Sequence, residues 1–183
     1  YDDGGMNFAA RAALCARWAG FTNAQILDGG LSAWARCGLP LDEGAPVAAD
    51  HPAVERVNDF LRQTIAGAVP QMLGKAAFFN AVKQDDRLVI DGRPRERFAG
   101  RTETLDARPG HVPGAVNRPA TENLDADGSL KSREALRREW GAVIGRRDPR
   151  SIVQMCGSGV AACLNAAALD TAGILPIAEA VLY

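Results

Sequence analysis

Short apolar runs alternate with longer amphipathic segments along this chain of 183 residues. The runs at 87–91, 151–155 and 180–182 have the length and composition of buried parallel strands. Helical spacing recurs in the segments before and between these runs, at residues 7–19, 31–36, 54–66, 72–84, 96–100, 132–140 and 161–172. This alternation predicts an α/β fold, in which a parallel sheet carries helices on both faces.

The N-terminal part has the pattern of an incomplete domain. Tyr1-Asp2-Asp3 is typical of the end of a strand, and Ala24-Gln25-Ile26-Leu27 predicts another short strand. Proline, glycine and alanine without periodicity then predict a linker. We therefore expect two tandem domains: the C-terminal part of a first domain at 1–45, a linker at 46–70 and a second domain at 71–183.

A weak internal repeat supports two related domains. Strand, short loop, alanine-rich helix, Ala-Gly stop and short strand occur at residues 1–27 and again at 155–182. At the start of the loop, the first copy has Asp2 where the second has Cys156. A duplication in which only the second copy carries chemistry explains this difference.

Composition and charge narrow the function classes. The net charge of −1 gives no general attraction to nucleic acid or to anionic membranes, so we expect neither as a partner. No apolar run approaches the roughly 18 residues of a spanning helix. The four cysteines form no CxxC pair and the chain has two histidines, so we expect no metal. We expect free thiols in a reducing cytoplasm.

The segment Cys156-Gly157-Ser158-Gly159-Val160 carries the candidate chemistry, because it joins a predicted strand to a predicted helix. Such a loop directs several backbone N–H groups to one point at the positive end of the helix dipole, which stabilises a thiolate. A cysteine at a strand end is more often a small buried apolar residue. The glycines and the following helix favour a nucleophile that holds sulfur as a persulfide.

Two other cysteine chemistries fit the loop less well. A cysteine phosphatase needs an arginine near the end of the loop to clamp phosphate, and Gly157 to Ala162 contain none. A cysteine hydrolase needs a histidine base, but His111 stands in a Gly-His-Val-Pro-Gly turn sequence.

The residues from Cys156 to Asn165 resemble the active loop of the 3-mercaptopyruvate sulfurtransferases in the rhodanese superfamily. Residues 110–117 and 123–132 resemble further signatures of that family, and 1–4 and 27–34 resemble the catalytically silent first domain of its tandem members. The resemblance implies a rhodanese fold with a silent segment at 1–45 and a catalytic domain at 71–183. It also implies transfer of sulfur from 3-mercaptopyruvate or thiosulfate to cyanide or a thiol, without a cofactor.

The resemblance also implies site residues. Arg97 matches a family arginine that binds the donor carboxylate, and Arg108 is a better candidate than Arg101 for a second; each has the alternative of a solvated surface arginine. The neutral loop favours 3-mercaptopyruvate over dianionic thiosulfate. Beside the nucleophile Cys156, the expected site consists of the loop residues Ser158, which steers a proton or holds substrate, and Gly157, Gly159, Val160 and Ala161.

The sequence also departs from the family pattern. Ala161 stands where the family usually has threonine, and Leu164 replaces a frequent histidine. An Asp/His pair that the first domain contributes in the family would precede Tyr1. These departures keep open an alternative, a non-catalytic rhodanese-type binding or regulatory module.

Overall fold

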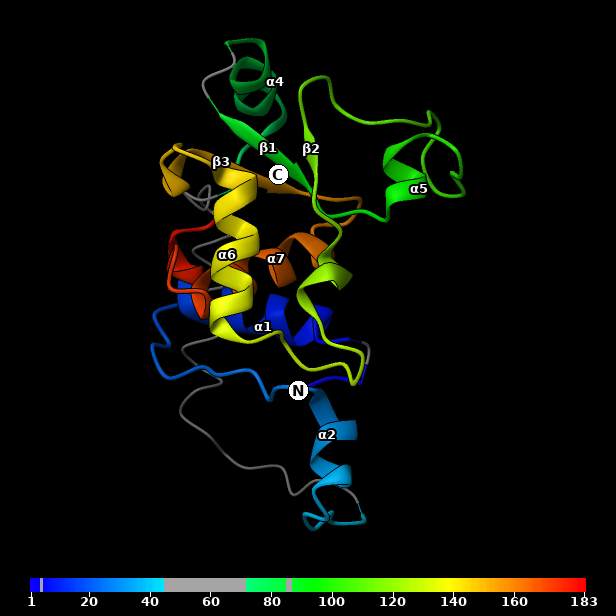
Figure 1. Ribbon diagram of the computed structural model, residues 1–183, viewed down its shortest axis with the longest axis vertical. Coiled ribbons are helices and arrows are strands. Elements are labelled where there is room, and N and C mark those ends of the chain that lie inside the picture. The colour runs from blue at the N-terminus through cyan, green and yellow to red at the C-terminus, as the bar shows by residue number, and fades with distance from the viewer. Residues whose placement is uncertain (4, 45–71, 85–86) are drawn as a thin grey trace.

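The computed structural model describes residues 1–3, 5–44, 72–84 and 87–183 (Figure 1). Its centre is a parallel four-stranded sheet in the order β2-β1-β3-β4. The strands are short and consist of β1 (Leu88–Asp91), β2 (Val116–Asn117), β3 (Ile152–Met155) and β4 (Val181–Leu182). The predicted α/β fold with a parallel sheet is confirmed.

The described α-helices are α1 (Asn7–Trp18), α2 (Gly30–Arg36), α4 (Lys75–Gln84), α5 (Arg95–Phe98), α6 (Arg133–Ile144) and α7 (Val160–Thr171). Three single-turn 3₁₀ helices, η1 (Ala120–Asn123), η2 (Pro149–Ser151) and η3 (Ile177–Glu179), complete the connections. In the described part of the chain, no helix has the length and apolarity needed to cross a membrane.

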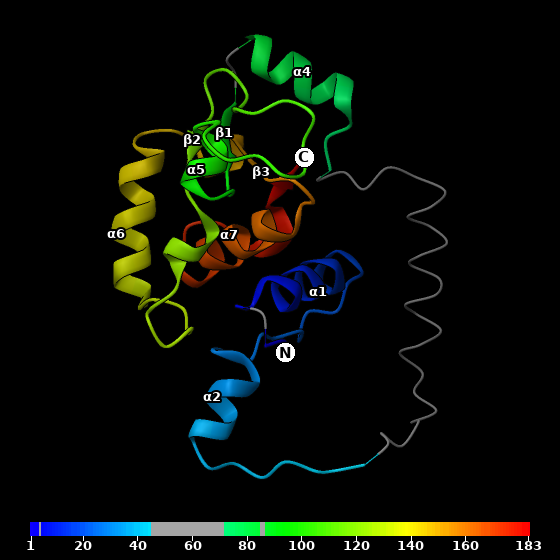
Figure 2. The same ribbon diagram turned by 90° about the vertical axis from the view of Figure 1, so that its right-hand side faces the viewer.

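The side chains of the central strands alternate between two layers of core, as the two-residue period of a strand requires. One layer joins the sheet to α6 and α7 and contains Leu88, Ile90, Ile152, Trp140 and Leu169. The other layer joins the sheet to α4 and contains Phe78, Val89, Val153 and Met155. Helices therefore cover both faces of the sheet (Figure 2).

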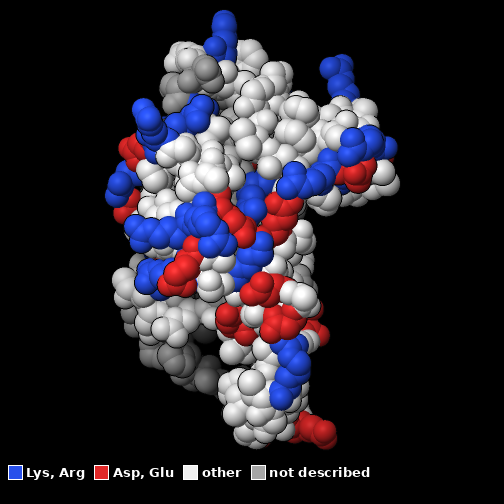
Figure 3. Space-filling view, in the orientation of Figure 1, with Lys and Arg blue, Asp and Glu red and all other residues white. Residues whose placement is uncertain are grey.

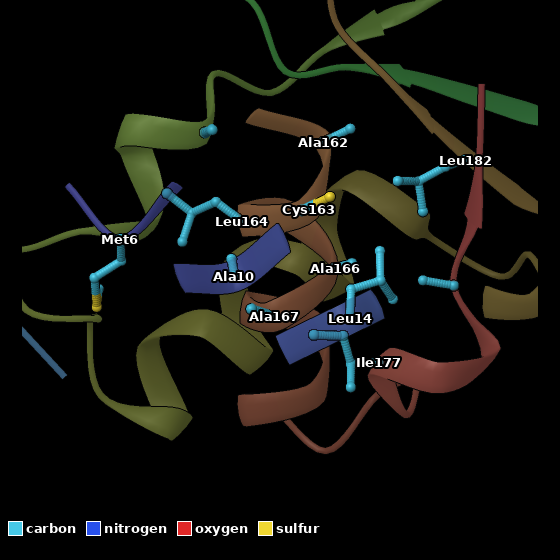
Figure 4. Close-up of a cluster of buried hydrophobic side chains, with 12 residues drawn as sticks. Met6, Ala10, Leu14, Ala162, Cys163, Leu164, Ala166, Ala167, Ile177 and Leu182 are labelled. Atoms are coloured by element: carbon cyan, nitrogen blue, oxygen red, sulfur yellow. The ribbon is translucent and has the colours of Figure 1, made fainter. Parts of the chain in front are cut away.

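Helix α1 packs along α7, on the side of α7 away from the sheet (Figures 1 and 2). The interface combines small and large apolar side chains, among them Ala10, Leu14, Ala166, Ala167 and Ile177 (Figure 4). Because alanine leaves the backbones free to approach closely, Leu14 fits into the α7 side and is buried. The N-terminal segment thus shares a core with the helix that follows Cys156.

The predicted cap of one helix is confirmed. Ser132 caps α6, where its hydroxyl accepts a hydrogen bond from the Ala135 N–H at 3.2 Å.

Outside the core, basic side chains gather over α6 with acidic ones between them (Figure 3). They include the exposed Arg133, Arg137 and Arg138.

The two predicted N-terminal strands are wrong, and the start of one predicted helix is misplaced. Residues 1–3 and 24–27 form no strand, because no segment of the described N-terminal region belongs to the sheet; Ile26 packs into the α1–α7 core instead. The helix predicted at 72–84 begins only at Lys75, since Met72 makes a parallel bridge to Leu182. The helix predicted at 54–66 and the whole of the linker predicted at 46–70 lie outside the described residues, so both stay predictions.

Candidate active site

Cys156 lies directly after β3, at the start of the loop that leads into α7. Gly159 is the N-cap of that helix, and its φ of 79° is the left-handed backbone conformation that glycine adopts without steric cost. This turn brings the Gly159 N–H to 3.0 Å from the Cys156 Sγ atom, to which it donates a hydrogen bond. The sulfur therefore lies at the positive end of the α7 dipole, where negative charge is stabilised.

The Cys156 side chain opens into a cleft of about 470 Å³. Residues from α1, from α5 and the segment before it, and from the loop after α5 line the cleft together with the cysteine loop. Those residues are Asn7, Phe8, Arg93, Pro94, Arg97, Leu105, Asp106, Cys156, Gly157, Ser158, Val160 and Ala161. The volume is sufficient for a small organic acid.

Arg97 brings positive charge to the cysteine loop. A Cβ atom at Gly157 would lie 3.7 Å from Nη1 of Arg97, so the guanidinium group is directly beside the loop backbone. The group is also paired with carboxylates: Nη2 lies 2.9 Å from Glu103 Oε1 and 2.9 Å from Asp106 Oδ2. Arg97 is therefore held in a fixed position by acidic residues of the loop that follows α5.

Arg93 is a second guanidinium group in the same cleft. Its Nη2 atom donates to Asp91 Oδ2 at 2.8 Å and to the Gly110 carbonyl at 2.7 Å. The buried carboxylate of Asp91, at the end of β1, raises the pKa of Arg93 above its ordinary value through this hydrogen bond. The pair fixes the start of α5 against the carboxyl end of the sheet.

Glu103 anchors the loop after α5. Its Oε1 atom accepts the backbone N–H groups of Thr104, Leu105 and Asp106 at 3.0, 2.9 and 3.1 Å. The Leu105 N–H, followed by the Arg97 guanidinium, lowers the pKa of Glu103 to about 2. The carboxylate is thus charged at all ordinary pH values and holds both the loop and Arg97.

Helix α1 also reaches the cysteine loop. Arg11 donates a hydrogen bond from Nη1 to the Ser158 carbonyl at 3.3 Å. Asp2 stands where the repeat has Cys156, and its carboxylate accepts the N–H groups of Met6 and Ala9 at the start of α1. The loop before α1 therefore places the Asp2 carboxylate at the N-terminus of α1, and the loop before α7 places the Cys156 thiol at the N-terminus of α7.

The structure brings most of the predicted site residues together. Arg97, Ser158 and the other predicted loop positions adjoin Cys156, either lining the cleft or bonding to its sulfur. Arg108 and Arg101 do not line the cleft, and Arg101 pairs with Glu96 instead. A role for Arg108 in binding stays a prediction.

His111 lies away from the cysteine. Its ring stacks on Phe98 with centroids 3.7 Å apart, and its Nδ1 atom lies 2.7 Å from the Phe98 carbonyl oxygen. The ring is not among the residues that line the Cys156 cleft. This position gives it no access to act as a base on the thiol.

All four cysteines are free thiols. Cys163 lies in the first turn of α7 and is buried. Its Sγ atom donates a hydrogen bond to the Gly159 carbonyl at 3.1 Å. Burial raises its pKa to about 12. Across the described ranges, no cluster of three or more histidine, cysteine or acidic residues is suited to a metal ion.

Four residues near the site are not predicted from the sequence: Arg93, Glu103, Asp106 and Arg11. A signal existed for Arg93, because Gly92-Arg93 directly follows the strand predicted at 87–91 and so stands at the carboxyl edge of the sheet. The other three depend on how the loop after α5 and helix α1 fold onto the site, and no local pattern in the sequence marks them.

Comparison with known proteins places this geometry in context. Residues 75–181 match the family described as "Rhodanese-like domain". The "Probable 3-mercaptopyruvate sulfurtransferase" of Pseudomonas aeruginosa is 36% identical over 174 residues, and the "3-mercaptopyruvate sulfurtransferase" of Escherichia coli K12 is 34% identical over 176. These alignments cover 94% and 93% of this chain but 58% and 57% of the relatives, so the chain spans less than three fifths of their length.

A solved structure is similar over the whole described fold. The crystal structure of SseA from Escherichia coli superposes with a TM-score of 0.70 and 31% sequence identity. The match covers 100% of this chain and 63% of SseA.

Proposed function

This chain belongs to the rhodanese-like domain family, and from that premise we propose that it is a sulfurtransferase with Cys156 as its nucleophile. The observation that carries the proposal is the position of the Cys156 sulfur. It receives the Gly159 N–H at 3.0 Å and shares a cleft with Arg97. A thiolate at a helix N-terminus and a guanidinium group beside it fit an anionic sulfur donor.

The first half of the proposed reaction loads the cysteine. The Cys156 thiolate attacks the sulfur of 3-mercaptopyruvate, a sulfur–sulfur bond forms and the carbon–sulfur bond breaks. The electron pair of that bond passes to the pyruvate carbon as an enolate, which then takes up a proton. Arg97 binds the donor carboxylate, and Ser158 is placed to hold the donor or to steer the proton. With thiosulfate as donor, sulfite leaves instead.

The second half unloads the cysteine. Cyanide or a thiolate attacks the outer sulfur of the persulfide, takes it as thiocyanate or as a new persulfide, and leaves the Cys156 thiolate restored. Backbone N–H groups at the start of α7, with Gly157 and Gly159 leaving space, stabilise the charged outer sulfur between the two halves. We propose that Val160 and Ala161 form the apolar wall against which donor and persulfide lie.

The names of the relatives and the neutral loop residues Gly157 and Ser158 support 3-mercaptopyruvate as the preferred donor. Four free thiols support a reducing compartment such as the cytoplasm. We keep residues 1–45, 46–70 and 71–183 as the proposed silent segment, linker and catalytic domain.

Thiocyanate formation tests the proposal. The protein and its Cys156→Ser variant are compared with 3-mercaptopyruvate and with thiosulfate at equal cyanide concentration. We expect turnover that prefers 3-mercaptopyruvate and disappears in the variant. Turnover that survives Cys156→Ser would contradict the role of this cysteine. A folded protein that uses neither donor would favour the alternative of a binding or regulatory module. The feature of the chain that supports this alternative is Ala161 in the active loop.

A further inference from the structure

Asp106 pairs with Arg97 in the cleft that also holds Cys156. Its Oδ2 atom lies 2.9 Å from Arg97 Nη2 and 3.5 Å from Arg93 Nη1, so one carboxylate oxygen lies between two guanidinium groups. Asp106 lines the same cleft as Cys156. A donor carboxylate that binds Arg97 in this cleft therefore competes with the Asp106 carboxylate for the same guanidinium group.

Glu103 and Asp106 contact the same arginine but are held very differently. The Glu103 side chain is 5% exposed and bonds to three backbone N–H groups as well as to Arg97. The Asp106 side chain is 48% exposed, and its direct hydrogen bond is the one to Arg97. Displacing Glu103 would dismantle the loop, whereas Asp106 can turn into solvent at the cost of its contacts to Arg97 and Arg93.

The charged side chains around Arg97 restrict which anion can replace Asp106. Arg93 and Arg97 contribute two positive charges, and Asp91, Glu103 and Asp106 contribute three negative ones. The cluster therefore has a net charge of −1 while Asp106 is present. A doubly charged donor is repelled by this charge about twice as strongly as a singly charged donor, because Coulomb energy scales with the product of charges.

We propose that Asp106 is a specificity-determining residue, which competes for Arg97 and selects donors that carry a single carboxylate over dianions such as thiosulfate. This inference rests on the proposed sulfur transfer and deepens it by assigning the choice of donor to one residue. The neutral cysteine loop and Asp106 then both disfavour a dianionic donor. The loop offers a dianion no positive side chain, and Asp106 adds a negative charge beside the place where the donor anion binds.

The test compares Asp106→Asn with the protein and with a matched control, Glu96→Gln. The control also removes one negative charge near Arg97, but Glu96 is exposed, pairs with Arg101 and does not line the cleft. For each protein, kcat and KM are measured at low ionic strength with 3-mercaptopyruvate and with thiosulfate.

We expect Asp106→Asn to lower KM by about fivefold for each negative charge on the donor, the factor for unit charges about 4 Å apart in a water-like dielectric. The ratio of kcat/KM for thiosulfate to that for 3-mercaptopyruvate then rises about fivefold. Glu96→Gln leaves the ratio within twofold, and Asp106→Ala shifts it in the same direction as Asp106→Asn. An unchanged ratio in both Asp106 variants overturns the inference.

Binding measurements separate this inference from the proposed function. Calorimetry with the Cys156→Ser protein, with and without Asp106→Asn, gives the affinities for 3-mercaptopyruvate and thiosulfate without turnover. A wild-type protein that is inactive with both donors refutes sulfur transfer, yet a fivefold shift in relative affinity would still support the role of Asp106. An active wild type with no shift in either assay refutes the role of Asp106 alone.

Discussion

Leu14 provides a direct test of how the N-terminal segment is built into the site. It is 1% exposed and lies in the α1–α7 interface with Ala166, Ala167 and Ile177 (Figure 4). Leu14→Ala removes a fully buried side chain from a packed interface, and the alanine side chains of α7 beside it are too short to fill the space. We expect the free energy of unfolding to fall by about 3 kcal/mol, within the range of about 2–5 for buried Leu→Ala changes.

Urea unfolding followed by circular dichroism measures this loss. With a slope of about 2 kcal/mol per molar urea, the loss lowers the transition midpoint by about 1.5 M. Leu41→Ala is the matched control, because the same atoms are removed from a side chain that is 56% exposed, and we expect a shift below about 0.3 M. Equal midpoints for the two variants would refute the packing of α1 on α7.

Three further predictions concern Glu103, Cys163 and Gly30. The pKa of Glu103 lies near 2 in the folded protein against an ordinary 4.5, so its contribution to stability is present above pH 4.5 and lost as the pH falls toward 2. The difference in urea midpoint between wild type and Glu103→Gln should therefore be smaller at pH 3 than at pH 6; an equal difference would contradict the assignment. The pKa of Cys163 is raised to about 12, so we expect iodoacetamide at pH 8 to leave this thiol unalkylated in the native protein and to alkylate the exposed Cys37. Mass spectrometry measures both, and equal labelling would show that α7 opens. Gly30→Ala places a Cβ against the backbone carbonyl oxygen of Asp2, whereas Gly20→Ala, also at positive φ, meets nothing within 4 Å. Thermal melting should show the larger loss of stability for Gly30→Ala, and equal losses would refute the close approach.

The strands and helices next to the site could be predicted from the sequence because local signals mark them. The run Leu88–Asp91 has the apolar pattern of a buried strand, and Ser132 provides a local cap for α6. The cysteine loop is marked by its glycines, and Gly159 adopts the positive φ that such a loop needs. These features depend on neighbours in sequence, which a pattern records.

The errors come from features that depend on distant neighbours. Residues 24–27 have strand-forming composition, but a strand needs a partner to accept its backbone hydrogen bonds, and Ile26 packs against the α1–α7 core instead. Arg11 and Asp106 reach the site through the folding of α1 and of the loop after α5. Their chemistry is visible in the sequence, but their proximity to Cys156 is set by tertiary packing.

The most direct test of the central claim is to locate the transferred sulfur. The protein is incubated with 3-mercaptopyruvate without an acceptor, the persulfide is trapped by alkylation, and peptides are sequenced by mass spectrometry. We predict one added sulfur atom on Cys156, none on Cys15, Cys37 or Cys163, and its disappearance when cyanide is added. Sulfur on another cysteine, or persulfide on Cys156 that cyanide fails to remove, would contradict the account.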